Sequence, residues 1–148
     1  PLPWLMERIR DDAPARLAGE AFSSITGVDL AWLDLERDAP QALPVPAGEN
    51  APPTMVDPGE DEDLPWPDAG KVEGWWAANA ARFAAGPGYF VGGPLGREHA
   101  LEVLSGGFQR QRLAAAVHLC LLQPGTVHFN CMAPSWRQQR LLAGLSPA

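Results

Sequence analysis

Apolar side chains recur at helical spacing in the first 27 residues of the chain. Residues 2–10 and 15–26 each place them three and four positions apart, which is the spacing of one helix face. Pro14 suits a helix start and Gly27 a helix end. We therefore predict an αα-hairpin. On its second helix the expected buried face consists of Leu17, Ala18, Ala21, Phe22 and Ile25.

One hairpin buries little apolar surface and normally stacks on a neighbouring unit. We therefore expect it to be the last repeat of a helical array whose earlier repeats are missing. The chain begins with Pro rather than Met, so we also expect it to be a piece of a longer protein. After the hairpin, Asp29 could cap a short helical stretch over residues 31–35.

The second half of the chain has the same helical periodicity. Asp68 is a suitable N-cap for a helix that runs to about Phe83. Its expected buried face consists of Val72, Trp75, Trp76, Asn79 and Phe83. Further helices are predicted over residues 96–104, over 108–122 and from Pro134 onward. The helix over 108–122 is apolar almost all round in its second half, which indicates a central core helix.

Two short runs between these helices favour extended chain. Residues 89–91 (YFV) lie between glycine and proline turns, and residues 126–129 (TVHF) follow Pro124 and Gly125. The predicted fold class is mostly α with up to two very short strands. The predicted organisation is a terminal helical hairpin (1–35), an acidic proline-rich loop (36–68) and a C-terminal helical domain (69–148).

The charge of the chain is concentrated in residues 36–68. This stretch has nine acidic residues, one Arg and eight of the sixteen prolines. Repeated prolines exclude long helices and central strands. Residues 1–35 sum to −3, this stretch to −8 and residues 69–148 to +4, which gives the total of −7. Such an acidic chain favours a basic protein partner and disfavours direct binding to nucleic acid.

Composition narrows the class of protein further. An apolar share of 46% with six tryptophans is enough for a packed core. No apolar run is long enough for a membrane span, and no export leader is visible, so we expect a cytoplasmic protein that does not bind membranes. Cys120 and Cys131 form no metal or disulfide signature, and Cys120 is expected to be a small buried apolar residue.

The acidic run is the strongest candidate for a function. Its carboxylates could form a solvated loop, bind a divalent cation, or face a basic protein surface as inhibitors of nucleic-acid enzymes do. Calcium loops need alternating ligands and a central Gly, and Pro58 and the contiguous acids disrupt that spacing. Trp66, beside the acids, would be an interface anchor if exposed. The candidate binding residues are Asp57, Glu60, Asp61, Glu62, Asp63, Trp66 and Asp68.

Other patterns give no catalytic site. His128 and Cys131 are spaced like two metal ligands, but no second pair completes a tetrahedral site. His118 on the helix over 108–122 is expected to be structural. Motifs for nucleophilic catalysis and for phosphate binding are absent from the sequence. We predict a protein that is not an enzyme and needs no metal or other cofactor.

Four arginines follow Gly106, and no acidic residue does. They could pair with the acidic segment, solvate two helix faces, or hydrogen-bond with glutamines across a helix pair. The last alternative rests on the two similar sequences QRQR (109–112) and RQQR (137–140).

Several long phrases of the chain resemble one bacterial protein family. They are RLAGEAFSSITGVDLAWLDLER, DEDLPWPD, WWAANAARF, GYFVGGPL, FQRQRLAAAVHLCLLQPG and FNCMAPSWRQQRLL, in this order. They are similar to the C-terminal half of proteins whose N-terminal half is an array of HEAT-like helical repeats. The resemblance covers essentially the whole chain and implies that residues 2–26 are the last HEAT-like hairpin.

The resemblance also implies a function. Some members of this family are encoded beside type VI secretion effectors, and one similar to this chain looks like an immunity protein for a nuclease effector with a PAAR-type tip domain. An antitoxin that binds and blocks its cognate nuclease toxin is therefore expected. The alternative is a non-enzymatic scaffold or adaptor of a secretion-associated complex. The family supplies no catalytic or toxin-contacting residues, and the oligomeric state is left open.

Overall fold

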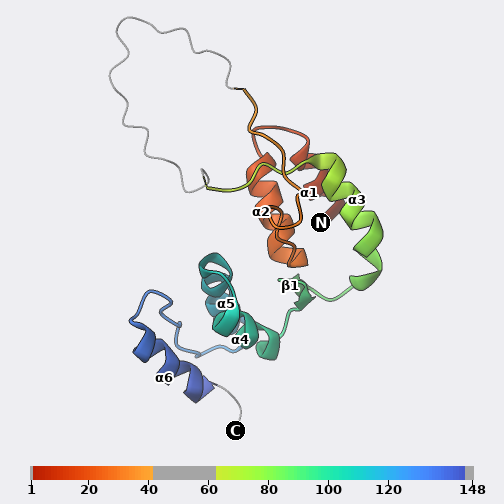
Figure 1. Cartoon of the computed structure of the whole chain (residues 1–148). Helices are drawn as coiled ribbons and strands as arrows, with labels where there is room; N and C mark the ends of the chain where they lie inside the picture. The colour runs from red at the N-terminus through yellow and green to blue at the C-terminus, as the bar shows by residue number, and fades with distance from the viewer. Residues whose placement is uncertain (1, 42–62, 146–148) are drawn as a thin grey trace, which may run out of the picture. The chain divides into compact units, whose positions relative to one another are not determined.

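The computed structural model describes residues 2–41 and 63–145, and this part of the chain is mostly α-helical, as predicted (Figure 1). Its elements are α1 (Leu2–Ile9), α2 (Ala15–Thr26), α3 (Ala69–Asn79), the 3-10 helix η1 (Ala80–Arg82), β1 (Tyr89–Phe90), β2 (Gly93–Pro94), α4 (Arg97–Gly106), α5 (Gln109–Leu122) and α6 (Ser135–Leu145). The described residues form two compact units, one of residues 2–23, 28–41 and 63–83 and one of residues 24–27 and 84–145.

The first unit has its core between α1, α2 and α3. Helix α1 buries Leu2, Leu5 and Ile9, and it lies against α3. Helix α2 buries Ala18 and Phe22 as predicted, but Leu17 is 53% exposed. Leu17 precedes Ala18 by one position, or about 100° around the helix, so the buried stripe is narrower than expected.

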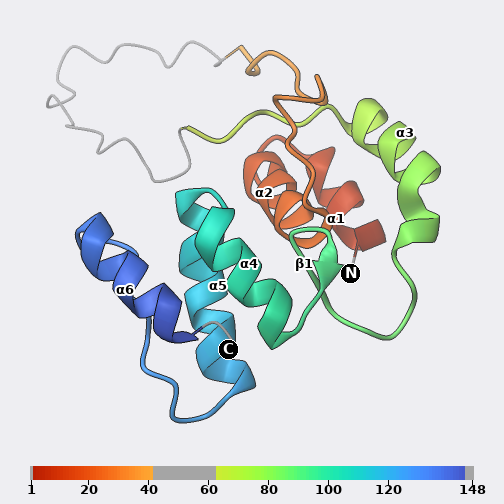
Figure 2. The ribbon, with the colours of Figure 1, turned by 60° about the horizontal axis from the view of Figure 1, so that its bottom comes forward.

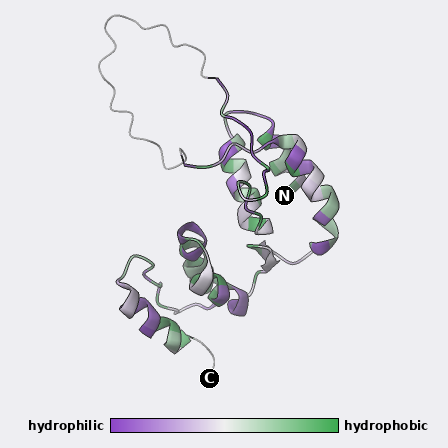
Figure 3. Ribbon diagram, viewed as in Figure 1, coloured by the Kyte–Doolittle hydropathy of each residue, from purple (hydrophilic) through white to green (hydrophobic). Residues whose placement is uncertain are grey.

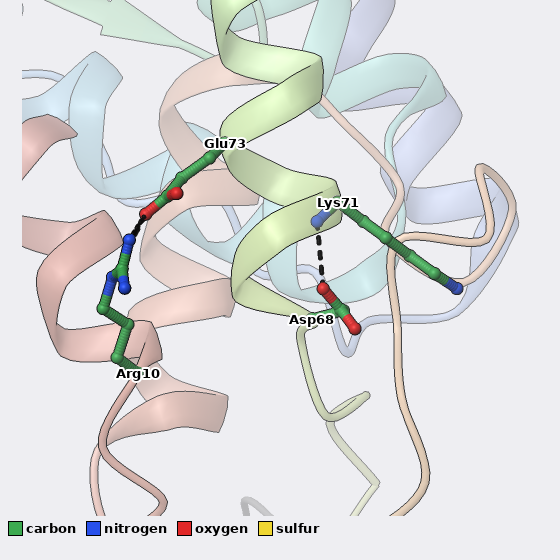
Figure 4. A network of polar contacts seen from close by, with 4 residues as sticks. All are labelled: Arg10, Asp68, Lys71 and Glu73. Atoms are coloured by element: carbon green, nitrogen blue, oxygen red, sulfur yellow. Dashed lines mark hydrogen bonds and ion pairs between the residues drawn. The ribbon is translucent and has the colours of Figure 1, made fainter.

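Helix α3 belongs to the first unit because its tryptophans pack on Phe22. The rings of Trp75 and Trp76 meet the fully buried Phe22 ring edge-on, with centroid distances of 5.8 and 6.4 Å. An ion pair of 2.5 Å joins Arg10 to Glu73 (Figure 4). Residues 69–83 thus group with α1 and α2 in the first unit.

The predicted start of α3 is confirmed, whereas its end is earlier than expected. Asp68 has an extended backbone, and its carboxylate accepts the Lys71 backbone N–H at 2.9 Å (Figure 4). The helix ends at Asn79, whose side-chain amide donates to the Trp75 carbonyl. The chain continues as η1 to Phe83, which packs against Trp76.

The predicted helix over residues 31–35 is absent, and a turn takes its place. The Asp29 carboxylate accepts the Trp32 backbone N–H at 3.0 Å, as a cap does. The chain then reverses at Asp34, whose φ of 54° is not helical, and the Leu35 N–H donates to the Leu30 carbonyl.

In the second unit, the predicted extended run at residues 89–91 supplies β1, which pairs antiparallel with β2, with Tyr89 opposite Pro94. The sequence did not predict the pairing with β2, because Gly93 and Pro94 favour a turn. The turn between them is bound to the end of α2, because the Val91 N–H donates to the Ser24 carbonyl at 2.7 Å. Gly27 lies beside this turn with φ +73°, and a Cβ there would be 2.7 Å from the Val91 carbonyl carbon. Only glycine adopts this positive φ without strain and also lacks the Cβ that would collide with Val91.

The rest of the second unit is built on α4 and α5, which pack side by side (Figures 1 and 2). The predicted strand over 126–129 is absent, and this stretch has no regular structure. The buried core, mostly apolar, consists of Phe90, Ala100, Val103, Leu104, Ala115, Ala116, Leu119, Phe129 and Cys131.

Helix α5 is not the fully buried core helix that its sequence suggested. It buries Ala115, Ala116 and Leu119, but Leu113, Val117 and Leu121 are exposed on another face. Cys120 is half-buried, and the buried cysteine is Cys131. An apolar sequence indicates which side chains favour burial, but neighbouring elements cover only one face of this helix.

Helix α6 has no fully buried side chain, but its half-buried Leu142 and Leu145 pack against the core, and polar contacts also hold it. The Arg112 guanidinium donates to the Leu104 carbonyl at 2.8 Å and to the Gln138 side-chain oxygen. Gln138 in turn donates to the Cys131 carbonyl at 3.0 Å. The predicted arginine–glutamine bond across a helix pair is therefore confirmed for Arg112 and Gln138.

Candidate protein-binding site

The two ends of the acidic segment are hydrogen-bonded to each other on the first unit. Glu36 and Pro67 form an isolated antiparallel bridge. The Arg37 N–H donates to the Trp66 carbonyl, and the Asp68 N–H to the Leu35 carbonyl, both at 2.8 Å. Residues 35–37 and 66–68 therefore lie side by side on the first unit.

A polar groove of about 420 Å³ lies at this junction. It is lined by Asp34, Glu36, Arg37, Asp38, Asp68 and Lys71. Four carboxylates against two cations leave an excess of two negative charges. The groove therefore presents mostly acceptor oxygens to a partner.

The two cations of the groove are held by partners within the first unit, Lys71 by residues of the groove and Arg37 by residues beside it. The Lys71 ammonium donates to the Asp34 carboxylate at 3.2 Å and to the Glu36 carbonyl at 3.1 Å. The Arg37 guanidinium donates to the Asp12 carboxylate at 2.5 Å and to the Pro67 carbonyl at 3.3 Å. Asp38 is exposed and has no ion pair within the described residues.

Trp66 lies beside the groove and is half-buried. The guanidinium carbon of Arg16 is 4.9 Å from the centroid of its ring, and that of Arg37 is 5.4 Å away. Cations over an aromatic face are attracted by the ring quadrupole. Trp66 thus fixes the groove wall by its contact with Arg37, and only part of its surface is open to a partner.

The predicted binding residues are only partly within the described chain. Asp57, Glu60, Asp61 and Glu62 lie outside it. Asp63 is exposed, whereas Asp68 is half-buried and caps α3.

Asp34 and Lys71 were not among the predicted binding residues, and Glu36 and Asp38 were counted only as charge. The available signal was the alternation of Glu36 and Asp38, because alternate residues of an extended chain point to the same side. Asp34 lies in the preceding turn, so this rule does not apply to it.

The charge of the surrounding surface has the same sign as the groove. The described residues of the first unit include eleven acidic and six basic side chains, for a net charge of 6 − 11 = −5. Those of the second unit include two acidic residues and five arginines, for 5 − 2 = +3. A basic partner would therefore be attracted to the first unit.

The described residues give no sign of metal or thiol chemistry. Within them, no three His, Cys, Asp or Glu side chains come together to hold a metal ion. Burial raises the pKa of the Cys131 thiol, and the nearby Arg112 charge lowers it by a smaller amount. A buried thiol of raised pKa is a poor nucleophile. His118 packs its ring on Phe90, with the centroids 4.6 Å apart.

None of the helices in residues 2–41 and 63–145 combines the length and the apolar character needed to cross a membrane. Comparisons with protein-family models, with curated proteins and with solved structures find no match to this chain. The acidic groove and its surroundings therefore carry the functional argument.

Proposed function

We propose that this protein is a non-enzymatic immunity protein that binds a basic, secreted nuclease toxin in the cytoplasm and neutralises it. The observation that carries the proposal is the acidic groove at the junction of the two ends of residues 36–68, on a unit with an excess of acidic side chains. Nucleases bind phosphates through basic surfaces, and a carboxylate-lined surface offers the same charge.

The anchored ends support this function in a second way. An interface needs charges at defined positions, because ordering flexible groups on binding costs free energy. The bridge fixes the backbone of Glu36, and the cap of α3 fixes the carboxylate of Asp68. In the proposed complex, these two carboxylates and Asp38 contact the toxin together with the acids of the run 57–63.

Charge neutralisation tests the proposal. The test variant combines Asp34→Asn, Glu36→Gln and Asp38→Asn, which removes three charges from the groove. The test uses the nuclease toxin domain that the proposal takes as the cognate partner. We expect association measured by stopped flow at low salt to slow by about tenfold or more, because electrostatic steering accelerates encounter.

A matched control removes three carboxylates of the first unit outside the groove, by Glu7→Gln, Asp11→Asn and Glu20→Gln. This control should change the association rate much less than the groove variant does. Equal slowing in both would mean that only net charge matters, and an unchanged rate in the groove variant would place the interface elsewhere.

A scaffold or adaptor is the second candidate, and one observation favours it. Leu113, Val117 and Leu121 of α5 are four residues apart and exposed, so they form an apolar stripe. Such a stripe is typical of a helix that docks on another protein. A scaffold would give no protection from the nuclease and would co-purify with a structural partner, which separates the two functions.

A further inference from the structure

The second unit contains a cavity of about 410 Å³ between α4, α5 and α6, closed on one side by residues 126–129. Its walls are mainly apolar, with Leu101, Leu119, Phe129 and Leu141 among them. In Figure 3 the hydrophobic part of α6 is its C-terminal half, which supplies Leu141 to this wall. The volume is within the range of small-molecule sites.

Two arginines, Arg97 and Arg140, also line this cavity. The Arg97 guanidinium donates to the Leu145 backbone carbonyl at 2.9 Å. The guanidinium carbon of Arg140 lies 5.3 Å from the centroid of the Trp136 ring. Neither is paired with a carboxylate within the described residues, so each guanidinium has donors available for an anionic ligand.

The chemistry of these walls selects one class of ligand. An apolar cavity takes an alkyl chain, and a guanidinium at its edge takes a carboxylate, because a charge-assisted bond to arginine is strong and directional. A cationic amphiphile would meet two like charges, and an uncharged one would leave the guanidinium groups unused. We propose that this cavity binds a long-chain aliphatic carboxylate, with its alkyl chain among the leucines and its carboxylate at Arg97 and Arg140.

The loose attachment of α6 is consistent with such a site. This helix has no buried residue, although Leu142 and Leu145 pack against the core of the unit. An alkyl chain in the cavity would cover apolar surface of the exposed Leu141 and the half-buried Leu101, and burial of apolar surface provides the driving force. The proposal does not depend on the acidic groove.

Calorimetry of the whole chain with sodium octanoate, decanoate and dodecanoate, each below its micelle concentration, tests the proposal. We expect saturable 1:1 binding that strengthens roughly fourfold with each added methylene until the cavity is full. Dodecyltrimethylammonium, which has the same chain and the opposite charge, should bind much more weakly. Equal binding of this cation, or no saturable binding of dodecanoate, would overturn the proposal.

Variants then locate the site. Arg97→Gln and Arg140→Gln should each weaken dodecanoate binding by about tenfold. The matched control is Arg137→Gln, on α6 like Arg140 but outside the cavity, and it should bind as the unchanged chain does. Leu141→Trp, at a partly exposed wall position, should reduce binding by filling space while circular dichroism shows the fold intact. Binding insensitive to all three cavity variants would refute this site.

Discussion

Substitution of Phe22 tests the packing that assigns α3 to the first unit. Its ring is fully buried and contacts both Trp75 and Trp76 edge-on. Phe22→Ala removes the ring and leaves a cavity that the helices fill only partly. Such substitutions cost about 3–5 kcal/mol of the free energy of unfolding. Phe22→Leu keeps most of the volume and should cost less than half as much.

Urea unfolding followed by far-UV circular dichroism measures this loss, provided that the transition of the first unit is resolved from that of the second. Phe108→Ala is the control, because its side chain is 68% exposed, and its effect should stay within about 0.5 kcal/mol. Hydrogen exchange adds a local readout, in which amide protection in α3 should fall more than in α5. A loss below about 1 kcal/mol for Phe22→Ala would refute the proposed core.

Three further predictions concern single side chains. Asp68→Ala should destabilise the first unit by about 1 kcal/mol in urea unfolding, and Asp68→Asn by much less, because Asn also caps the helix. Gly27→Ala should destabilise the second unit by more than about 1 kcal/mol, since a Cβ would meet backbone 2.7 Å away at φ +73°. Gly74 lies in the middle of α3 with open space around it, so Gly74→Ala should instead stabilise the first unit by about 0.5–1 kcal/mol. Destabilisation by both alanine substitutions, or stabilisation by both, would contradict this reasoning. Cys120 should react with iodoacetamide faster than Cys131, whose thiol is buried and has a raised pKa, and mass spectrometry of the labelled peptides would show the reverse order if the burial were wrong.

The raised pKa of Cys131 also gives a sign for the pH dependence of stability. The folded state holds the thiol proton of Cys131 more tightly than the unfolded chain does. The resulting contribution to the free energy of unfolding is therefore fully present below the pKa of the thiol in the unfolded chain. This contribution is lost as the pH rises through the pKa of the thiol in the folded protein. Cys131→Ser should therefore flatten the fall in stability on the alkaline side, which unfolding at several pH values would measure.

Local signals in the sequence predicted most of the helices. The Asp68 cap, the Gly27 stop and the Pro134 start are short-range features, and each lies at the boundary of a helix or next to it. The prediction of a strand over 126–129 was wrong because strand formation depends on a partner. Within the described residues, no neighbouring strand pairs with this stretch. Apolar runs in the sequence also led us to expect more buried side chains than the structure has, because Leu17 and Leu121 are exposed.

The sequence predicted the region of the acidic groove but not the residues that line it. The density of acids in residues 36–68 marked the region, but the bridge between Glu36 and Pro67 depends on a contact between residues 31 positions apart. The role of Lys71 as the partner of Asp34 depends on the same contact. The contact between Trp66 and two arginines was likewise hidden, because Arg16 lies on α2, far from it in sequence.

Inhibition of the nuclease toxin that we propose as the partner measures the central claim most directly. The toxin domain is titrated with this chain, and DNA cleavage is followed at 50 and 300 mM salt. We predict loss of cleavage at one equivalent, with an inhibition constant that weakens steeply with salt because screening shortens the reach of the groove's charges. Cleavage that persists at a large excess of this chain, with no binding at either salt concentration, would contradict the immunity function.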